Sequence, residues 1–154
     1  MLSLPTTTNR VRGRSSEAAN RQVDEDIERH VAFFDARLEL IGQRLDELDR
    51  EWDVERVLEA NAATLALTGT VLGILDDRRF LAIPMVVTAF LLQHALQGWC
   101  PPLPVLRRLG VRTAREIERE RTALKALRGD FARIEGMEVG EPRARVQAAL
   151  QAAL

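Results

Sequence analysis

Two apolar stretches joined by a short charged turn constrain the fold of this chain more than any other feature. The first, VLEANAATLALTGTVLGIL, covers residues 57–75, and the second, FLAIPMVVTAFLLQHALQGW, covers residues 80–99. As helices they would measure about 28 Å and about 30 Å at 1.5 Å per residue, which is close to the roughly 30 Å hydrocarbon core of a bilayer. The sequence therefore predicts a transmembrane helical hairpin, residues 57–110 with its exit segment, that enters and leaves the membrane on one face.

The charge distribution separates this apolar middle from two polar arms. Charged residues make up 29% of the chain, yet from 57 to 106 full charges occur only at Glu59 and in the DDRR turn at 76–79. Apolar residues surround the predicted helix at 80–92, and a water-soluble helix of that kind has to be wholly buried. A net charge of −1 gives no field that would attract nucleic acid. We expect membrane lipid as a partner and no nucleic acid; a soluble helical bundle that binds an apolar ligand or partner is the alternative.

Small residues recur along one side of the first apolar stretch. Their spacing of four, three and four includes the GxxxG pattern GTVLG, which lets two helix backbones approach closely inside a bilayer. The predicted packing residues are Ala62, Ala66, Gly69 and Gly73.

The ends of the two predicted helices carry polar and basic residues that indicate depth and orientation. Glu59 and Asn61 begin the first helix, and Gln93 and His94 finish the second, so an antiparallel pair would bring them together near the membrane surface. Arginines are more frequent in the arms beside the hairpin than in its turn, where two aspartates offset them. By the positive-inside rule we expect both termini in the cytoplasm.

The N-terminal arm, residues 15–56, has apolar residues at alternating spacings of four and three, the pattern of a coiled-coil seam. A single amphipathic helix lying on the protein's own core is the alternative. The predicted seam consists of Ile27, Val31, Phe34, Leu38, Ile41, Leu45, Leu48 and Trp52. We expect a homo-oligomer or a helical protein partner bound through residues 23–52 and 113–134.

The remaining segments complete an all-α prediction of a two-helix transmembrane hairpin flanked by long amphipathic helices. Residues 1–14 read as a disordered basic tail, because Pro5 stands where a secretory signal would need its apolar region; an organellar transit peptide is the alternative. The capping-box pattern TARE at 113–116 opens an amphipathic helix over 111–135. Gly136, Gly140 and Pro142 then predict a linker and short tail helix over 136–154.

Cys100 is the only cysteine and the one nucleophile worth considering. A catalytic thiolate needs a lowered pKa, whereas Cys100 follows the C-terminal end of a predicted helix, where the helix dipole disfavours an anion. One cysteine and two histidines are a thin supply of ligands for a metal site. We therefore expect a protein that is not an enzyme, with no catalytic residue, cofactor or metal; a thiol site at Cys100 in a sulfur-handling accessory protein is the alternative.

The residues around Cys100 predict the exit from the membrane. Gly98 can end the helix, and Trp99 suits the boundary between membrane and water. Pro101, with Pro102 and Pro104, should prevent the helix from resuming. Arg107 and Arg108 should then lie at the level of the lipid headgroups.

This exit segment resembles the YgaP-like transmembrane domain, a small bacterial inner-membrane family whose two apolar helices end in a G-aromatic-C-P … L-G pattern. The matching residues are Gly98, Trp99, Cys100, Pro101, Leu109 and Gly110, and the resemblance covers about residues 58–113. It implies location in a bacterial inner membrane and a largely undefined role. Some members are fused to a rhodanese sulfurtransferase, but sulfur transfer does not carry over to a chain without that domain.

Overall fold

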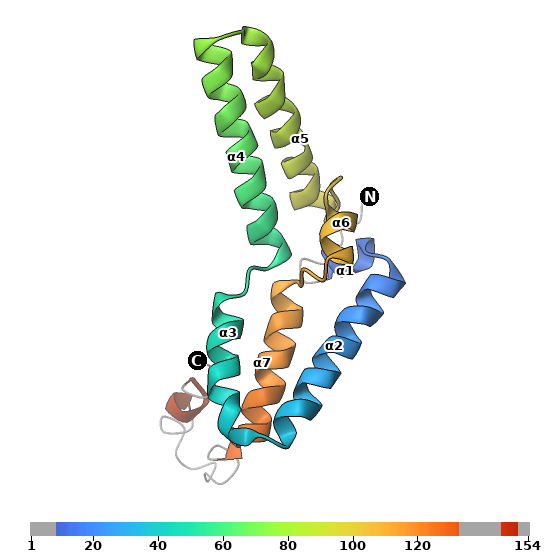
Figure 1. Cartoon of the computed structure of the whole chain (residues 1–154), viewed down its shortest axis with the longest axis vertical. Coiled ribbons are helices and arrows are strands. Elements are labelled where there is room, and N and C mark those ends of the chain that lie inside the picture. The colour runs from blue at the N-terminus through green and yellow to red at the C-terminus, as the bar shows by residue number, and fades with distance from the viewer. Residues whose placement is uncertain (1–8, 133–145, 151–154) are drawn as a thin grey trace. The chain divides into compact units, whose positions relative to one another are not determined.

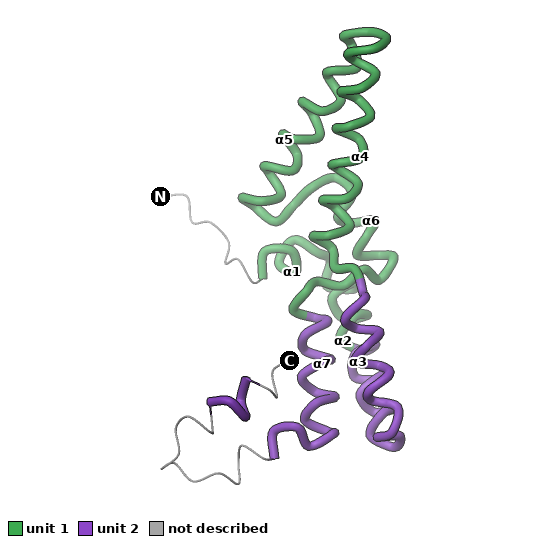
Figure 2. Tube along the Cα trace, turned by 90° about the vertical axis from the view of Figure 1, so that its left-hand side faces the viewer, with its two compact units in different colours: residues 1–24, 52–115 green, residues 25–51, 116–154 purple. Residues whose placement is uncertain are grey.

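The computed structural model describes residues 9–132 and 146–150. Two compact units divide the chain, one formed by residues 1–24 with 52–115 and the other by residues 25–51 with 116–154 (Figure 2). The described residues form helices and turns without a strand, which confirms the all-helical class. The elements labelled in Figure 1, with the two short 3-10 helices η1 and η2, are α1 Arg10–Arg14, α2 Glu17–Asp35, η1 Leu38–Leu40, α3 Ile41–Arg50, α4 Val54–Leu75, η2 Arg78–Leu81, α5 Ala82–Gln97, α6 Leu103–Arg108 and α7 Ala114–Arg128.

In the first unit, α4 and α5 lie side by side and run in opposite directions, with η2 between them (Figure 1). The Asp53 carboxylate caps α4 by accepting a hydrogen bond of 2.7 Å from the Arg56 backbone N–H. α5 ends at Gly98, whose positive φ of 72° is a left-handed conformation that favours glycine. The helices thus begin and end within three residues of the predicted bounds 57–75 and 80–99.

Close approach between α4 and the start of α5 depends on two glycines of the small-residue stripe. A Cβ atom on Gly69 would lie 2.7 Å from Cβ of Ile83 and 2.7 Å from Cδ of Pro84. A Cβ atom on Gly73 would lie 2.6 Å from a methyl carbon of Leu81. At Gly69 the neighbouring atoms are a Cβ and a proline ring carbon, which cannot move aside, so only glycine fits there. At Gly73 the Leu81 side chain would have to shift to make room for a Cβ atom.

Gly69→Val is expected to lower the free energy of unfolding by about 1–3 kcal/mol, the usual cost of inserting atoms into a packed contact. Thermal unfolding followed by circular dichroism in one detergent would measure the change. Ala63→Val is the matched control, because Ala63 is exposed on the same helix. Equal melting temperatures for the two variants would contradict the close contact of α4 with α5.

The first unit contains a small apolar core at the N-terminal end of α4. Its buried members are Val11, Val54, Leu58, Cys100 and Leu103. α1 contributes Val11, and the Arg12 guanidinium pairs with the Asp24 carboxylate. The prediction of a disordered tail over residues 1–14 is therefore wrong for Arg10–Arg14, because these buried and paired side chains hold α1 in place; residues 1–8 lie outside the described part.

The segment predicted as one helix over residues 15–56 forms several shorter helices. α2 ends at Asp35, η1 follows at Leu38–Leu40, and α3 begins at Ile41 and ends at Arg50. A single helix over 15–56 is therefore a wrong prediction. The break brings α3 against α7 of the same chain, where Ile41 and Leu45 cluster with Ile117 and Leu124.

The eight predicted seam residues consequently have different environments. Ile27, Ile41, Leu45 and Leu48 are buried, and Val31 and Phe34 are partly buried against the same core. Leu38 and Trp52 are each 49% exposed, because one lies in the break and the other between α3 and α4. The seam therefore does not continue along one face, and most of it is used inside the chain.

A buried layer of charge lies beside this apolar core. The Glu120 side chain of α7 is fully buried and accepts a hydrogen bond of 2.9 Å from Nε of Arg44 on α3. Nδ1 of His30 on α2 lies 3.3 Å from the same carboxylate. α7 ends at Arg128, before Gly129 with φ 86°, and so is shorter than the predicted 111–135. Residues 146–150 are helical, while the rest of the predicted linker and tail lies outside the described residues.

Candidate functional site

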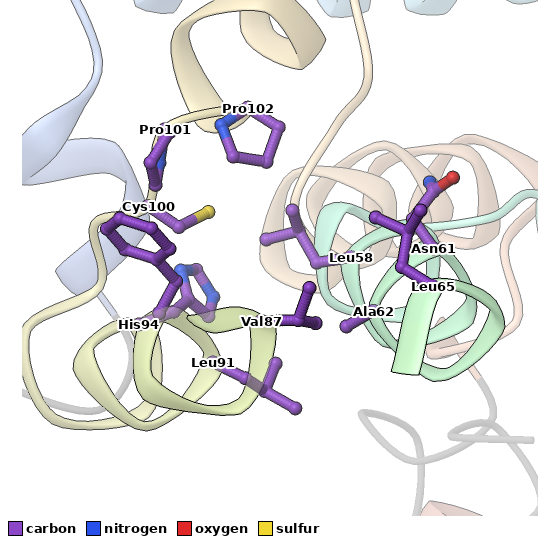
Figure 3. Close-up of a pocket in the computed structure, with 11 residues that line it drawn as sticks. Leu58, Asn61, Ala62, Leu65, Val87, Leu91, His94, Cys100, Pro101 and Pro102 are labelled. Atoms are coloured by element: carbon purple, nitrogen blue, oxygen red, sulfur yellow. The ribbon is translucent and has the colours of Figure 1, made fainter. Parts of the chain in front are cut away.

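A hollow of about 230 Å³ lies between the N-terminal half of α4 and the C-terminal part of α5 (Figure 3). One side comes from α4, another from α5, and Cys100 and the two prolines after it close the end (Figure 3). Its walls are almost entirely apolar. The lining residues are Leu58, Asn61, Ala62, Leu65, Val87, Phe90, Leu91, His94, Cys100, Pro101 and Pro102.

His94 is the polar residue that the structure places most deeply in this wall, since it is only 3% exposed. Its Nε2 lies 2.7 Å from Oε2 of Glu55, on the first turn of α4. The other oxygen of Glu55 accepts a hydrogen bond of 3.1 Å from Arg10, whose guanidinium also donates to the Ala95 carbonyl at 2.9 Å. These three side chains connect α1, α4 and α5.

The Glu55 contact determines which nitrogen of His94 remains available. A carboxylate accepts hydrogen bonds but does not donate them, so Nε2 of His94 carries the hydrogen of this contact. Nδ1 is buried without a hydrogen-bond partner among the described residues. A buried polar atom left unpaired costs about 1–3 kcal/mol.

Cys100 is 4% exposed and belongs to the apolar core of the unit. Burial raises the pKa of the Cys100 thiol, against an opposing hydrogen bond from the Leu103 backbone and with a smaller contribution from the Glu55 charge in the same direction. Its sulfur points into the hollow in Figure 3. A neutral, buried thiol is the opposite of an activated nucleophile.

Cys100 is expected to react much more slowly with a maleimide in the folded chain than after denaturation. The raised pKa also makes the stability of the fold depend on pH. The stabilisation contributed by the buried neutral thiol is fully present below the pKa of the unfolded thiol, and it is lost as pH rises through the pKa of the folded thiol. Mass spectrometry of the labelled chain at pH 7.5, with and without denaturant, would measure both rates. Equal rates would revive the interpretation of Cys100 as a reactive thiol.

The predicted exit residues have mixed outcomes. Gly98 ends α5, and a Cβ atom there would lie 2.6 Å from Cβ of Arg10. Trp99 is partly buried against the core, whereas Arg108 is exposed.

Two details of the predicted exit are wrong. A helix does resume, since α6 begins at Leu103 with Pro104 in its first turn, where proline lacks no needed hydrogen bond. Arg107 is 1% exposed and donates to the Val111 carbonyl at 3.0 Å and to the Asn20 side chain at 3.1 Å. It therefore holds the fold together and does not reach outward to headgroups.

The remaining predicted site residues are distributed along α4. Ala62 lines the hollow, and Ala66 is partly buried. Gly69 lies against the first turn of α5, and Gly73 lies against Leu81 of η2. Within residues 9–132 and 146–150, no group of three or more His, Cys, Asp or Glu side chains is placed to hold a metal ion.

Sequence reasoning anticipated that His94 meets the start of the first apolar helix but missed its partner. Glu59 is exposed, and the contact is made by Glu55, one turn earlier. Glu55 lies 39 positions from His94, and Arg10 lies 85 positions from Ala95. Glu55 could have been suggested as a partner, because in an antiparallel pair the start of α4 lies beside the end of α5. No feature of the N-terminal sequence suggested that Arg10 would join this contact.

In comparisons with known proteins, no family model, curated protein or solved structure matches the chain. The resemblance to the YgaP-like domain therefore stays a prediction.

Proposed function

We propose that this chain is an integral membrane protein that is not an enzyme, and that α4 and α5 form its hairpin anchor. The observation that carries the proposal is the exposure of apolar side chains along both helices. In the described residues, two stretches are long and apolar enough to cross a membrane, Leu38–Leu75 and Arg78–Gln97, and only 17% and 6% of their most apolar windows are buried. Side chains this apolar are stable when lipid surrounds them.

Water would be a poor solvent for this surface. Soluble proteins rarely expose contiguous apolar patches larger than a few hundred Å². Many large apolar residues of α4, η2 and α5 are exposed. They are Leu65, Leu67, Val71, Leu72, Ile74, Leu75, Leu81, Ile83, Met85, Val86, Phe90, Leu92 and Leu96. A soluble bundle would need another protein to cover them.

The polar helices outside the anchor supply the second part of the proposal. They bind another copy of the chain or a helical partner, through residues 23–52 and 113–134. Since Ile41, Leu45 and Leu48 pack inside the chain, the surface offered to a partner is the exposed apolar group Phe33, Leu38 and Leu40 at the break between α2 and α3. Charge asymmetry favours both termini in the cytoplasm of a bacterial cell.

Membrane fractionation tests the anchor directly. After expression in bacteria and lysis without detergent, the chain is expected in the membrane pellet and to resist extraction by alkaline carbonate. Recovery in the supernatant would overturn the proposal and leave the soluble bundle.

Labelling of single cysteines tests the orientation. In a Cys100→Ala background, Arg78→Cys in the turn is expected to react with a membrane-impermeant maleimide applied to cells with a permeabilised outer membrane. Glu39→Cys, at an exposed position on η1, is expected to react only after the inner membrane is opened. The reverse pattern would place the termini on the other side.

A further inference from the structure

Positive charge is concentrated in the first unit and is not balanced there. The residues of this unit, 1–24 and 52–115, include eleven arginines against seven aspartates and glutamates, a net charge of +4. The second unit has eleven basic and sixteen acidic residues, a net charge of −5, so the two together give the −1 of the whole chain. The DDRR turn between α4 and α5 is neutral. The surplus therefore belongs to the other end of the helix pair, where α1 and α6 lie (Figure 1).

We propose that this basic end binds the headgroups of anionic phospholipids through Arg14 of α1 and Arg108 of α6. The inference rests on the proposed function, because it needs the α4–α5 pair in a bilayer. It adds the class of lipid that the anchor prefers, which apolar helices alone do not select.

The fold leaves the guanidinium groups of Arg14 and Arg108 open to a ligand. Arg10, Arg12 and Arg107 bind acceptors inside the unit. Arg14 and Arg108 are exposed, and neither forms an ion pair with any residue that the structure describes. A guanidinium presents several N–H donors in a planar fork that matches the oxygens of a phosphate. An anionic headgroup would supply the counter-charge that both arginines lack.

Packing holds both arginines at the same end of the helix pair. Val11 of α1 and Leu103 of α6 belong to one buried cluster with Val54, which begins α4. α1 also lies against the end of α5, since a Cβ atom on Gly98 would lie 2.6 Å from Cβ of Arg10. The phosphates of a bilayer lie just outside its hydrocarbon core of about 30 Å. If α4 and α5 cross that core, α1 and α6 lie at the depth of the phosphates.

The exposed face of α6 selects a lipid over a soluble anion. Val105 is 56% exposed and Leu109 is 74% exposed, and residues three and four apart lie on one side of a helix, so both apolar side chains accompany Arg108. Trp52 is 49% exposed, with the Arg56 guanidinium 4.6 Å from its ring centre, and tryptophan is frequent at the boundary of membranes. A soluble phosphate or a nucleic acid would leave this carbon surface in water. A phospholipid offers phosphate to the guanidinium and acyl chains to its neighbours.

Two lipids with the same acyl chains and different headgroup charge test the inference. Full-length protein purified in dodecyl maltoside would be titrated with dioleoyl phosphatidylglycerol or with dioleoyl phosphatidylcholine, and native mass spectrometry would count the lipids that each chain retains. One arginine near anionic headgroups contributes about fivefold in affinity, which is about 1 kcal/mol. With two arginines, phosphatidylglycerol is expected to bind about 25-fold more tightly than phosphatidylcholine. The ratio should fall as the salt concentration is raised.

Matched pairs of substitutions make the result specific to this end of the unit. Arg14→Gln with Arg108→Gln is expected to remove most of the preference for phosphatidylglycerol and to leave binding of phosphatidylcholine unchanged. Arg14→Lys with Arg108→Lys keeps the charge and should retain most of the preference. Arg78→Gln with Arg79→Gln removes two charges from the exposed turn at the other end, and this control should keep the full preference.

Several outcomes would overturn the inference. These are equal affinities for the two lipids, an undiminished preference in the glutamine pair, a lysine pair that behaves like the glutamine pair, or an equal loss in the turn control. Displacement of phosphatidylglycerol by inorganic phosphate at equal concentration would also overturn it, because the site would then recognise any phosphate. If the wild type stays in the carbonate-resistant membrane fraction and gives one of these results, the lipid inference fails and the membrane anchor stands. If the wild type is soluble, the proposed function fails first.

Discussion

Leu67→Arg combined with Leu92→Arg is expected to remove the chain from the carbonate-resistant membrane fraction. Leu67 is 67% exposed near the middle of α4, and Leu92 is 61% exposed on α5. In a bilayer an arginine at the helix centre, as at Leu67, would cost about 2.5–3.5 kcal/mol of insertion free energy, and one nearer the helix end, as at Leu92, would cost less. Quantitative immunoblotting of pellet and supernatant after carbonate extraction would measure the loss.

The same substitutions separate the membrane protein from a soluble bundle. At an exposed position in water, a change to arginine usually alters stability by no more than about 0.5 kcal/mol. Val146→Arg is the matched control, because Val146 is 57% exposed and lies outside the apolar helices. A double variant that fractionates as the wild type would contradict the anchor.

Glu120→Ala is expected to destabilise the second unit by up to about 3–5 kcal/mol, because Arg44 loses its buried partner and keeps the half-exposed Glu47 carboxylate at 3.0 Å. Glu120 is fully buried, and the Arg44 side chain that donates to it at 2.9 Å is only 17% exposed. Hydrogen–deuterium exchange of the full chain should then accelerate in α3 and α7. It should change much less in α4 and α5, whose mutual contact does not involve this pair.

Glu118→Ala is the control for this prediction. Glu118 is on the same helix, with a side chain that is 60% exposed and paired with Arg121 at 3.2 Å, and exposed pairs contribute about 0–1 kcal/mol. Replacing both partners by apolar residues, Arg44→Met with Glu120→Leu, should recover most of the loss. If Glu120→Ala is as stable as the wild type, the buried charges do not hold the unit together.

The ends of the apolar helices were predictable because they depend on local chemistry. The left-handed conformation at Gly98 follows from the lack of a Cβ atom at the end of α5. Small residues at Gly69 and Gly73 indicated a helix contact before the contacting residues were known. Such features need information from only a few neighbouring positions.

The N-terminal arm was not predictable at the same level. A three-and-four spacing of apolar residues is satisfied by one long helix and equally by two helices that fold back on a third. No proline or glycine lies between Asp35 and Ile41 to indicate the break. Packing of Ile41 and Leu45 against Ile117 and Leu124 decides for the broken arrangement, and that contact joins residues far apart in the chain.

The candidate site was predicted only in its elements. Cys100 and His94 were considered singly, and the hollow that they share depends on the separation of α4 and α5 at this end. Arg107 was predicted to lie at the level of the lipid headgroups because it follows the proline-rich exit segment and stands beside Arg108. Its partner Asn20 lies 87 positions away, so its burial could not be inferred from the exit segment.

By itself, the sequence determined that the chain is helical, where its two apolar helices lie, and that both are long and apolar enough to cross a membrane. These properties follow from composition and spacing within one segment. Only the tertiary structure decided that the first arm folds back on α7, that Glu120 is buried with Arg44, and that Glu55 orients His94 beside an apolar hollow. Each of these depends on side chains that meet only after distant segments pack, because burial and pairing energies arise from contacts that local periodicity does not specify.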